Sequence, residues 1–215
     1  MGLSVSWRLN ADLTLDTIQT CLYYFRMARK KPVQSEARQR LLETADRLFY
    51  SGGIRNVGID TIIAEAGIAK MTLYTHFPSK DDLIVAVLQY REAQVLEFFR
   101  SSMERHGKRS RNKLQTFFAA LREWFELPGF RGCAFQNAAV ELADPAHPGT
   151  QFVRDHKQRF TEILRGFVEE SVGPAKTKVV AMIAILVEGA IVTAVVSGKP
   201  DAAEVARDAA LKLVE

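Results

Sequence analysis

Apolar residues along most of this 215-residue chain recur every three or four positions, and strict alternation of apolar and polar residues is nearly absent. That period is the period of an α-helix that buries one face. The clearest stripe lies between Ser35, which can cap a helix, and Gly52-Gly53, which can end one. Its residues are Leu41, Leu42, Ala45, Leu48 and Phe49. The pattern predicts an all-α fold.

Glycines, prolines and capping residues divide the chain into about nine expected helices. The segment 174–196 is apolar almost all round, which predicts a helix that is buried on most sides. Glu188 and Gly189 interrupt its apolar run before 18 residues are reached, so we expect no membrane-spanning segment. The expected ranges are 35–52, 58–67, 70–76, 79–105, 111–127, 133–142, 150–171, 174–196 and 201–214.

Three of these helices fit into about 45 residues, and the last two are short and joined by Ala66-Gly67-Ile68. The glycine allows a tight turn, and Ile62 and Ile68 can fill a small core, which is the geometry of a helix-turn-helix. The second helix of such a unit is free to lie in the major groove of DNA. On spacing alone, an ordinary helical hairpin with a glycine in its turn fits equally well.

Basic residues are concentrated in the same third of the chain. Residues 26–80 contain ten Lys and Arg and five Asp and Glu, whereas residues 81–215 contain eighteen of each kind. A basic head on a neutral body is the charge distribution of a DNA-binding head joined to a regulatory body. A chance imbalance of surface charge would look the same.

One continuous string carries a family resemblance. Residues 62–83 read IIAEAGIAKMTLYTHFPSKDDL. This closely resembles the signature of the TetR family, in which a helix ending in Ala-Gly-Val precedes a recognition helix with Leu-Tyr-x-His-Phe. The likeness extends roughly from residue 41 to residue 83, and the stretch 131–141 looks like an AcrR-like branch. The resemblance to the TetR family implies a three-helix DNA-binding domain over 34–80 and a helical dimerisation and ligand-binding domain over 81–215.

The resemblance also implies which residues meet DNA. Tyr74, His76 and Lys80 would contact phosphates, which set the register of the protein on the duplex. Base edges or sugars would face Lys70, Met71, Thr72 and Thr75, because lysine can donate to guanine and a methyl group can pack on thymine. For Tyr74 and Phe77, plain core packing is the alternative interpretation.

Two positions depart from the family pattern. Gly58 stands where a Thr or Ser usually caps the second helix, so the backbone N–H groups stay available to a phosphate but the hydroxyl is lost. Met71 replaces a common glycine and can add a base contact. The run from Arg29 to Lys31 fits an arm along the DNA backbone or a merely solvated charge run.

Residues 1–33 contain no part of the signature. We expect them to be an N-terminal extension that is disordered or lies upstream of the true start. Met27, followed by Ala-Arg-Lys-Lys, is the expected beginning of the basic head. A real extra helix is the alternative.

Aromatic residues are frequent in residues 81–215. The resemblance to the family implies an apolar effector pocket among the middle helices of this region. An ordinary aromatic core is the alternative. The candidate lining is Phe98, Phe99, Phe117, Trp124, Phe125, Phe135 and Phe152.

The last two expected helices resemble the dimer face of the family. Small residues there would let the helices of two copies approach closely and form a four-helix bundle. They are Ala184, Gly189, Ala190 and Ala194.

The sequence thus predicts a cytoplasmic, ligand-responsive transcriptional regulator rather than an enzyme. We expect a repressor that binds an inverted-repeat, double-stranded DNA operator as a homodimer and is released by a small apolar effector, with no cofactor, metal or membrane partner. Catalytic signatures are missing from the sequence, although Glu141, His147 and His156 could meet around a metal. A helical binding or adaptor protein without DNA binding is a further alternative.

Overall fold

The computed structural model describes residues 35–108, 110, 112–174 and 177–215, and the regular elements in these residues are nine helices. The all-α prediction is confirmed. The expected N-terminal extension over 1–33, including the start at Met27, lies outside the described residues. The helices are α2 (Glu36–Gly52), α3 (Ile59–Ala66), α4 (Lys70–His76), α5 (Lys80–Gly107), α6 (Lys113–Phe125), α7 (Ala134–Leu142), α8 (Pro148–Val172), α9 (Thr177–Ser197) and α10 (Ala202–Lys212).

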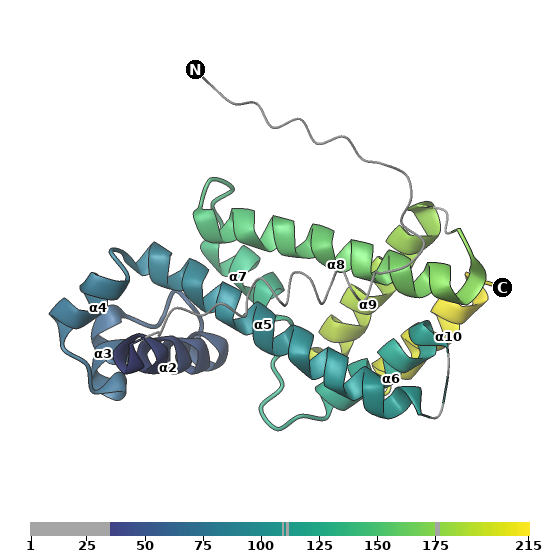
Figure 1. The fold of residues 1–215 in the computed structure, drawn as a ribbon, viewed down its shortest axis with the longest axis horizontal. Helices are drawn as coiled ribbons and strands as arrows, with labels where there is room; N and C mark the ends of the chain where they lie inside the picture. The colour runs from purple at the N-terminus through teal and green to yellow at the C-terminus, as the bar shows by residue number, and fades with distance from the viewer. Residues whose placement is uncertain (1–34, 109, 111, 175–176) are drawn as a thin grey trace, which may run out of the picture. The chain divides into compact units, whose positions relative to one another are not determined.

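Helices α2, α3 and α4 pack together on a small apolar core (Figure 1). Leu41 of α2, Ile62 of α3 and Leu73 of α4 are each fully buried in it. Helix α2 begins where the Ser35 hydroxyl accepts a hydrogen bond from the Arg38 N–H at 3.2 Å. Helix α3 ends at Gly67, whose left-handed backbone (φ 61°) suits glycine and turns the chain toward α4.

Helix α5 is the longest helix and runs from the α2–α4 cluster to α6 (Figure 1). Its first turns are buried through Leu83, Ile84, Val87 and Leu88, and the helix packs on α2, α6 and α8. One continuous helix therefore belongs both to the N-terminal cluster and to the rest of the described fold.

Helix α8 begins two residues earlier than the sequence pattern indicated. We expected the helix to begin at residue 150, but Pro148 is its first residue, where its missing N–H costs nothing. The His147 side chain caps the helix by accepting a hydrogen bond from the Gly149 N–H at 2.9 Å.

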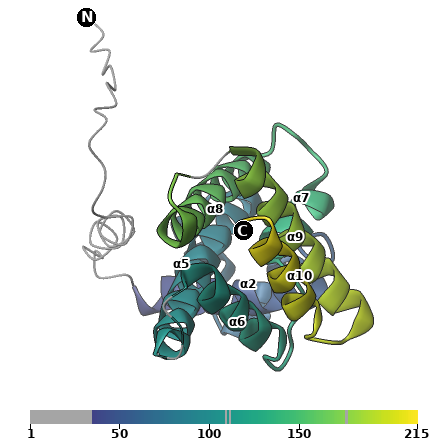
Figure 2. The ribbon, with the colours of Figure 1, turned by 90° about the vertical axis from the view of Figure 1, so that its right-hand side faces the viewer.

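Helices α9 and α10 lie side by side (Figure 2). The expectation that the α9 segment is buried on most sides is wrong for a single chain, because apolar side chains such as Ile185 and Val196 are exposed. By length and composition α9 could cross a membrane, and 33% of its most apolar 18-residue stretch is buried in the described fold. Core helices of water-soluble proteins have the same length and composition, so this feature is weak evidence for a membrane span.

Candidate nucleic-acid interface

Helix α4 exposes one face and buries the other. Leu73 and Phe77 are buried, so the core-packing interpretation of Phe77 is confirmed. On the outer face, Met71 is 79% exposed and Tyr74 is 41% exposed, and Thr75 is exposed as well. Tyr74 is therefore not a core residue. This is the amphipathic arrangement that a helix needs to present side chains to a groove.

The lysine of α4 is held by a carboxylate of α3. Lys70 Nζ donates a hydrogen bond to Asp60 Oδ1 at 3.0 Å, and both side chains remain largely exposed. The hydrogen bond and the negative charge of Asp60 raise the pKa of Lys70. Asp60 could not be identified from the sequence, because nothing in a ten-residue separation across a turn indicates a contact.

Two other predicted DNA contacts already have partners within the protein. His76 Nε2 lies 3.0 Å from the hydroxyl of Ser35, the residue that caps α2. Lys80 Nζ donates to the Ile54 carbonyl oxygen at 2.7 Å and lies 5.9 Å from the centre of the Phe49 ring. Both side chains fix the packing of the helices around α4, and both are partly exposed.

Gly58 begins α3 with extended backbone (φ −83°, ψ 161°) and no side-chain cap. A Cβ atom added there would meet no atom within 4 Å. The missing hydroxyl is therefore not imposed by crowding or by backbone strain.

Arg40 holds the turn between α3 and α4. Its guanidinium donates to the carbonyl oxygens of Ala66 at 2.6 Å and Gly67 at 3.2 Å, which are the last residue of α3 and the residue that caps it. The sequence did not single out Arg40, which is one of the ten Lys and Arg between residues 26 and 80.

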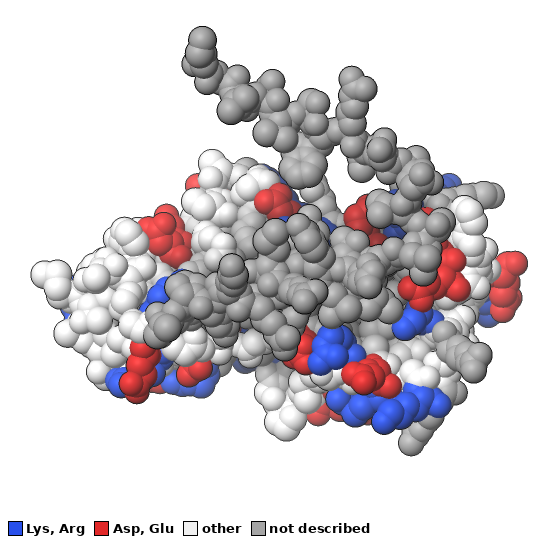
Figure 3. All heavy atoms as spheres, in the orientation of Figure 1, with Lys and Arg blue, Asp and Glu red and all other residues white. Residues whose placement is uncertain are grey.

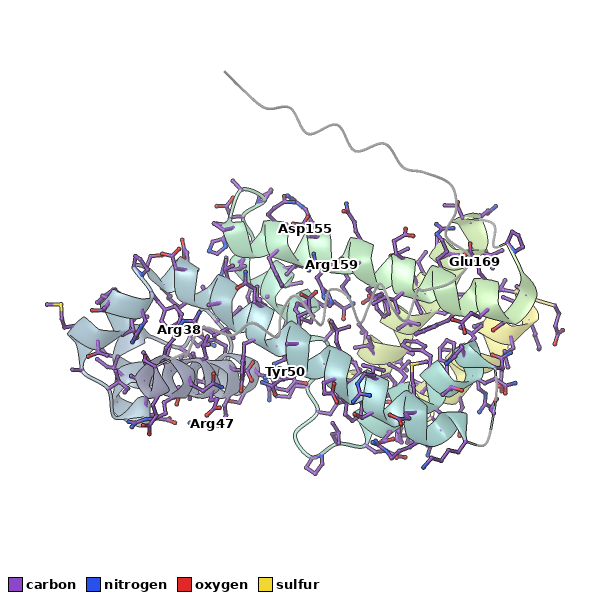
Figure 4. The ribbon with its side chains drawn as sticks, in the orientation of Figure 1. Arg38, Arg47, Tyr50, Asp155, Arg159 and Glu169 are labelled. Atoms are coloured by element: carbon purple, nitrogen blue, oxygen red, sulfur yellow. The ribbon has the colours of Figure 1, made fainter. Side chains whose placement is uncertain are left out.

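Positive charge is sparse on the face of the α3–α4 end seen in Figure 3, which is mostly uncharged. Four of the ten Lys and Arg counted between residues 26 and 80 precede residue 35, outside the described residues. Besides Arg40, two cations on α2 are engaged: Arg47 pairs with Glu65, and the Arg38 guanidinium lies 5.1 Å from the Phe77 ring centre. Both arginines are labelled on α2 in Figure 4.

The α2–α4 cluster is attached to the body by polar contacts as well as by α5. Tyr50, at the end of α2, bonds to the loop that precedes α7 (Figure 4). Glu141 of α7 accepts a hydrogen bond from the Arg55 N–H at 3.1 Å. Asp81, in the first turn of α5, lies 3.2 Å from Nε2 of His147.

The three residues considered above as a possible metal site contact separate partners. Glu141 contacts the Arg55 backbone, and His147 contacts Asp81. His156 Nδ1 lies 2.8 Å from Glu92 Oε1. The described residues contain no group of three or more His, Cys, Asp or Glu that could hold a metal ion.

The aromatic residues of the predicted pocket pack against one another in two groups. Phe99 is the centre of the first group, with ring centres of Phe98 and Phe117 at 5.5 Å and of Trp124 at 5.8 Å. Phe135 forms the second with Phe152 at 6.5 Å. A surface hollow of about 340 Å³ at α6 and α10 is lined by other, mostly charged residues. The effector pocket stays a prediction.

Helix α9 presents an apolar face to the outside. Gly189 lies on it, with open space where a Cβ would be, whereas Ala190 and Ala194 are buried within the chain and Ala184 is half-buried. Only one of the four small residues is thus available to a second copy. The exposed apolar residues of the face are Met182, Ile185, Val192, Val195 and Val196.

Known proteins match the same regions. Residues 41–87 match the family model described as bacterial regulatory proteins, tetR family. The HTH-type transcriptional repressor DhaR of Mycobacterium sp. is 31% identical over 134 residues, which are 62% of this chain and 61% of that protein. An HTH-type transcriptional regulator of Staphylococcus aureus is 44% identical over 54 residues, or 25% of this chain and 29% of that one. The chain thus spans less than two thirds of these curated relatives.

A solved structure extends the likeness to nearly the whole fold. The crystal structure of a TetR-family transcriptional regulator from Streptomyces coelicolor superposes with a TM-score of 0.72 and 34% identity, covering 84% of this chain and 95% of that one. The signature around α4, the order of the helices and this likeness over 84% of the chain agree. The chain therefore belongs to the TetR family of DNA-binding transcriptional regulators.

Proposed function

We propose that the protein is a ligand-responsive repressor that binds an inverted-repeat operator as a homodimer and is released by a small apolar effector. The observation that carries this is the outer face of α4, where Lys70, Met71, Tyr74 and Thr75 are exposed while Leu73 and Phe77 anchor the helix. In this proposal residues 34–80 bind DNA, and residues 81–215 bind the effector and the second copy in the cytoplasm.

The proposed contacts divide into those that read bases and those that fix register. Lys70, Met71, Thr72 and Thr75 face base edges or sugars. Tyr74, His76 and Lys80 hold phosphates, with the α3 N-terminus at Gly58 supplying backbone N–H groups. Lys80 has three N–H donors and uses one on Ile54, so two remain for a phosphate.

The proposed dimer interface is the exposed face of α9 together with α10. Ile185 is 71% exposed and Val196 is 81% exposed, and both belong to a contiguous apolar row on one helix. Exposed rows of this kind mark protein–protein contacts. A two-fold dimer also presents two copies of α4, which matches a two-fold operator.

Repression and effector release are the remaining parts of the proposal. The printed name of the mycobacterial relative describes a repressor. The aromatic groups around Phe99 and Phe135 are the proposed effector region, and α5 and Glu141 connect it to the DNA-binding end. An effector that favours one of two dimer arrangements shifts the equilibrium by its difference in affinity for them.

The test is to select duplexes from a randomised DNA library with the full chain, then footprint the selected site. We expect a protected region with dyad symmetry and an affinity that falls steeply with salt, by about 0.9 log units per log unit of salt for each phosphate neutralised. The dimer is measured by sedimentation. A monomer, a site without dyad symmetry or salt-independent binding contradicts the proposal.

A further inference from the structure

The first residue of α4 is a lysine that is exposed but not free. Lys70 Nζ lies 3.0 Å from Asp60 Oδ1, and the side chains are 57% and 82% exposed. Asp60 lies in the first turn of α3, so the ion pair joins the N-terminal turns of the two helices on either side of the turn at Gly67. The N-terminal residues of a recognition helix are those that reach base edges. The pair therefore lies where sequence is read.

We propose that Asp60 is a specificity-determining residue, which positions the Lys70 ammonium for a base edge and withholds it from the phosphates of other DNA. The inference rests on the proposed operator binding. Asp60 itself needs no contact with DNA and acts through Lys70.

The physical basis is the difference between phosphate and base contacts. Non-specific binding depends on cations that neutralise phosphates, and a lysine on its flexible stem can reach a phosphate of any sequence. While Lys70 is paired with Asp60, the pair carries no net charge, and the Asp60 carboxylate repels a phosphate that approaches the ammonium. A guanine edge carries no net charge and is not repelled in this way, and the ammonium keeps two N–H donors for O6 and N7 while the third stays on Asp60.

A second ion pair on the same helix supplies a matched control. Glu65, also on α3, accepts a hydrogen bond from Arg47 of α2 at 2.5 Å, with side chains 43% and 60% exposed. Neutralising Glu65 removes the same charge from α3 without touching α4. Exposed pairs contribute little to stability, so both Asp60→Asn and Glu65→Gln should fold, which melting curves will check.

The experiment measures affinities of the full chain for two duplexes over a range of salt. One duplex is selected from a randomised library by the wild-type protein, and the other has the same composition in scrambled order. We expect Asp60→Asn to bind the scrambled duplex about fivefold more tightly, the upper range for an exposed ion pair. Its salt slope there should steepen by about 0.9, as for one more phosphate contact. Affinity for the selected duplex should stay near the wild-type value.

Two further variants isolate the role of Lys70. Glu65→Gln should change the affinities for the selected and the scrambled duplex by the same factor. In a Lys70→Gln background, Asp60→Asn should leave the ratio of these two affinities unchanged. The inference is overturned if Asp60→Asn shifts both duplexes equally, or if its effect on the ratio persists without Lys70. If the wild-type protein does not discriminate between the two duplexes, the proposed operator binding is overturned as well. If the wild-type protein discriminates and Asp60→Asn does not change that discrimination, only this inference is overturned.

Discussion

The Tyr50 hydroxyl donates a hydrogen bond to the Gly132 carbonyl oxygen at 2.9 Å, joining the last turn of α2 to the loop between α6 and α7. The same hydroxyl accepts a hydrogen bond from the Arg131 N–H at 2.8 Å. On its other side, Gly132 faces α9: a Cβ added to it would lie 2.9 Å from a methyl carbon of Val195. This loop therefore touches both α2, which belongs to the proposed DNA-binding end, and the helix proposed to form the dimer.

Replacing Gly132 by alanine should destabilise the protein for two reasons. The backbone is in a region that favours glycine (φ 83°), and the new methyl group would collide with Val195. Gly129 is the control, since it has a similar φ of 76° in the same loop but open space around it. We expect Gly132→Ala to cost about 1–3 kcal/mol more than Gly129→Ala in denaturant unfolding. Adding Val195→Ala should remove most of that difference; no rescue would mean that the contact with α9 is unimportant.

Tyr50→Phe tests the link between α2 and the loop. Loss of the hydroxyl leaves a carbonyl and an N–H without their partner, which should cost about 1 kcal/mol of unfolding free energy. Operator affinity should fall, because α2 is then less firmly attached to the body. Ser51→Ala is the control, since the Ser51 hydroxyl bonds only to the Leu48 carbonyl of its own helix among the contacts described. Equal DNA affinities for the two variants would argue against the link.

Gly58→Ser should restore the missing cap of α3. The position has a φ of −83° and open space, so the serine fits without strain. We expect a gain of a few tenths of a kcal/mol in stability, roughly the difference between glycine and serine at an N-cap. Operator affinity should also rise, because the hydroxyl can donate to a phosphate at the helix N-terminus. Gly58→Ala adds the same Cβ without the hydroxyl, so an equal gain there would refute the explanation.

Ile185→Asp should convert the proposed dimer to a monomer. Ile185 is 71% exposed on α9, and a buried, unpaired carboxylate at an interface is strongly unfavourable. Val140→Asp is the control, because Val140 is 79% exposed but lies on α7. Sedimentation should show a monomer for the first variant and a dimer for the second, with operator affinity lost only in the first. Dimers in both cases would place the interface elsewhere.

Glu92 should contribute stability that disappears in acid. Burial alone would raise the pKa of this carboxyl, but hydrogen bonds with His156 and Arg159 outweigh it and hold the pKa below its ordinary value of 4.5. A lowered pKa gives stability that is present above the ordinary value and is lost as pH falls through the lowered one. Glu92→Gln should therefore cost about 1–3 kcal/mol near neutral pH and progressively less at acid pH.

The control for that prediction is Glu162→Gln. Glu162 is 67% exposed and pairs with Arg165 on its own helix. Its substitution should change stability little at any pH. A constant difference between wild type and Glu92→Gln across the pH range would show that the charge of Glu92 is not the cause.

The sequence by itself determined the local structure of this protein. The helical period, the cap at Ser35 and the glycine at 67 depend on neighbours within a few residues, and the structure has helices where they predict them. The start of α8 differed because proline at the first helical position was counted as loop. The string around Tyr74 was enough to indicate the family.

Only the tertiary structure decided which side chains meet. Lys70 pairs with Asp60, Lys80 bonds to Ile54, and Tyr50 reaches Gly132, across separations of 10, 26 and 82 residues. Such contacts depend on how helices pack, which a local period does not specify. For the same reason the sequence could not show which face of α9 stays uncovered: a helix that is apolar almost all round has no clear polar side to mark the surface, so burial is settled only by the helices packed against it.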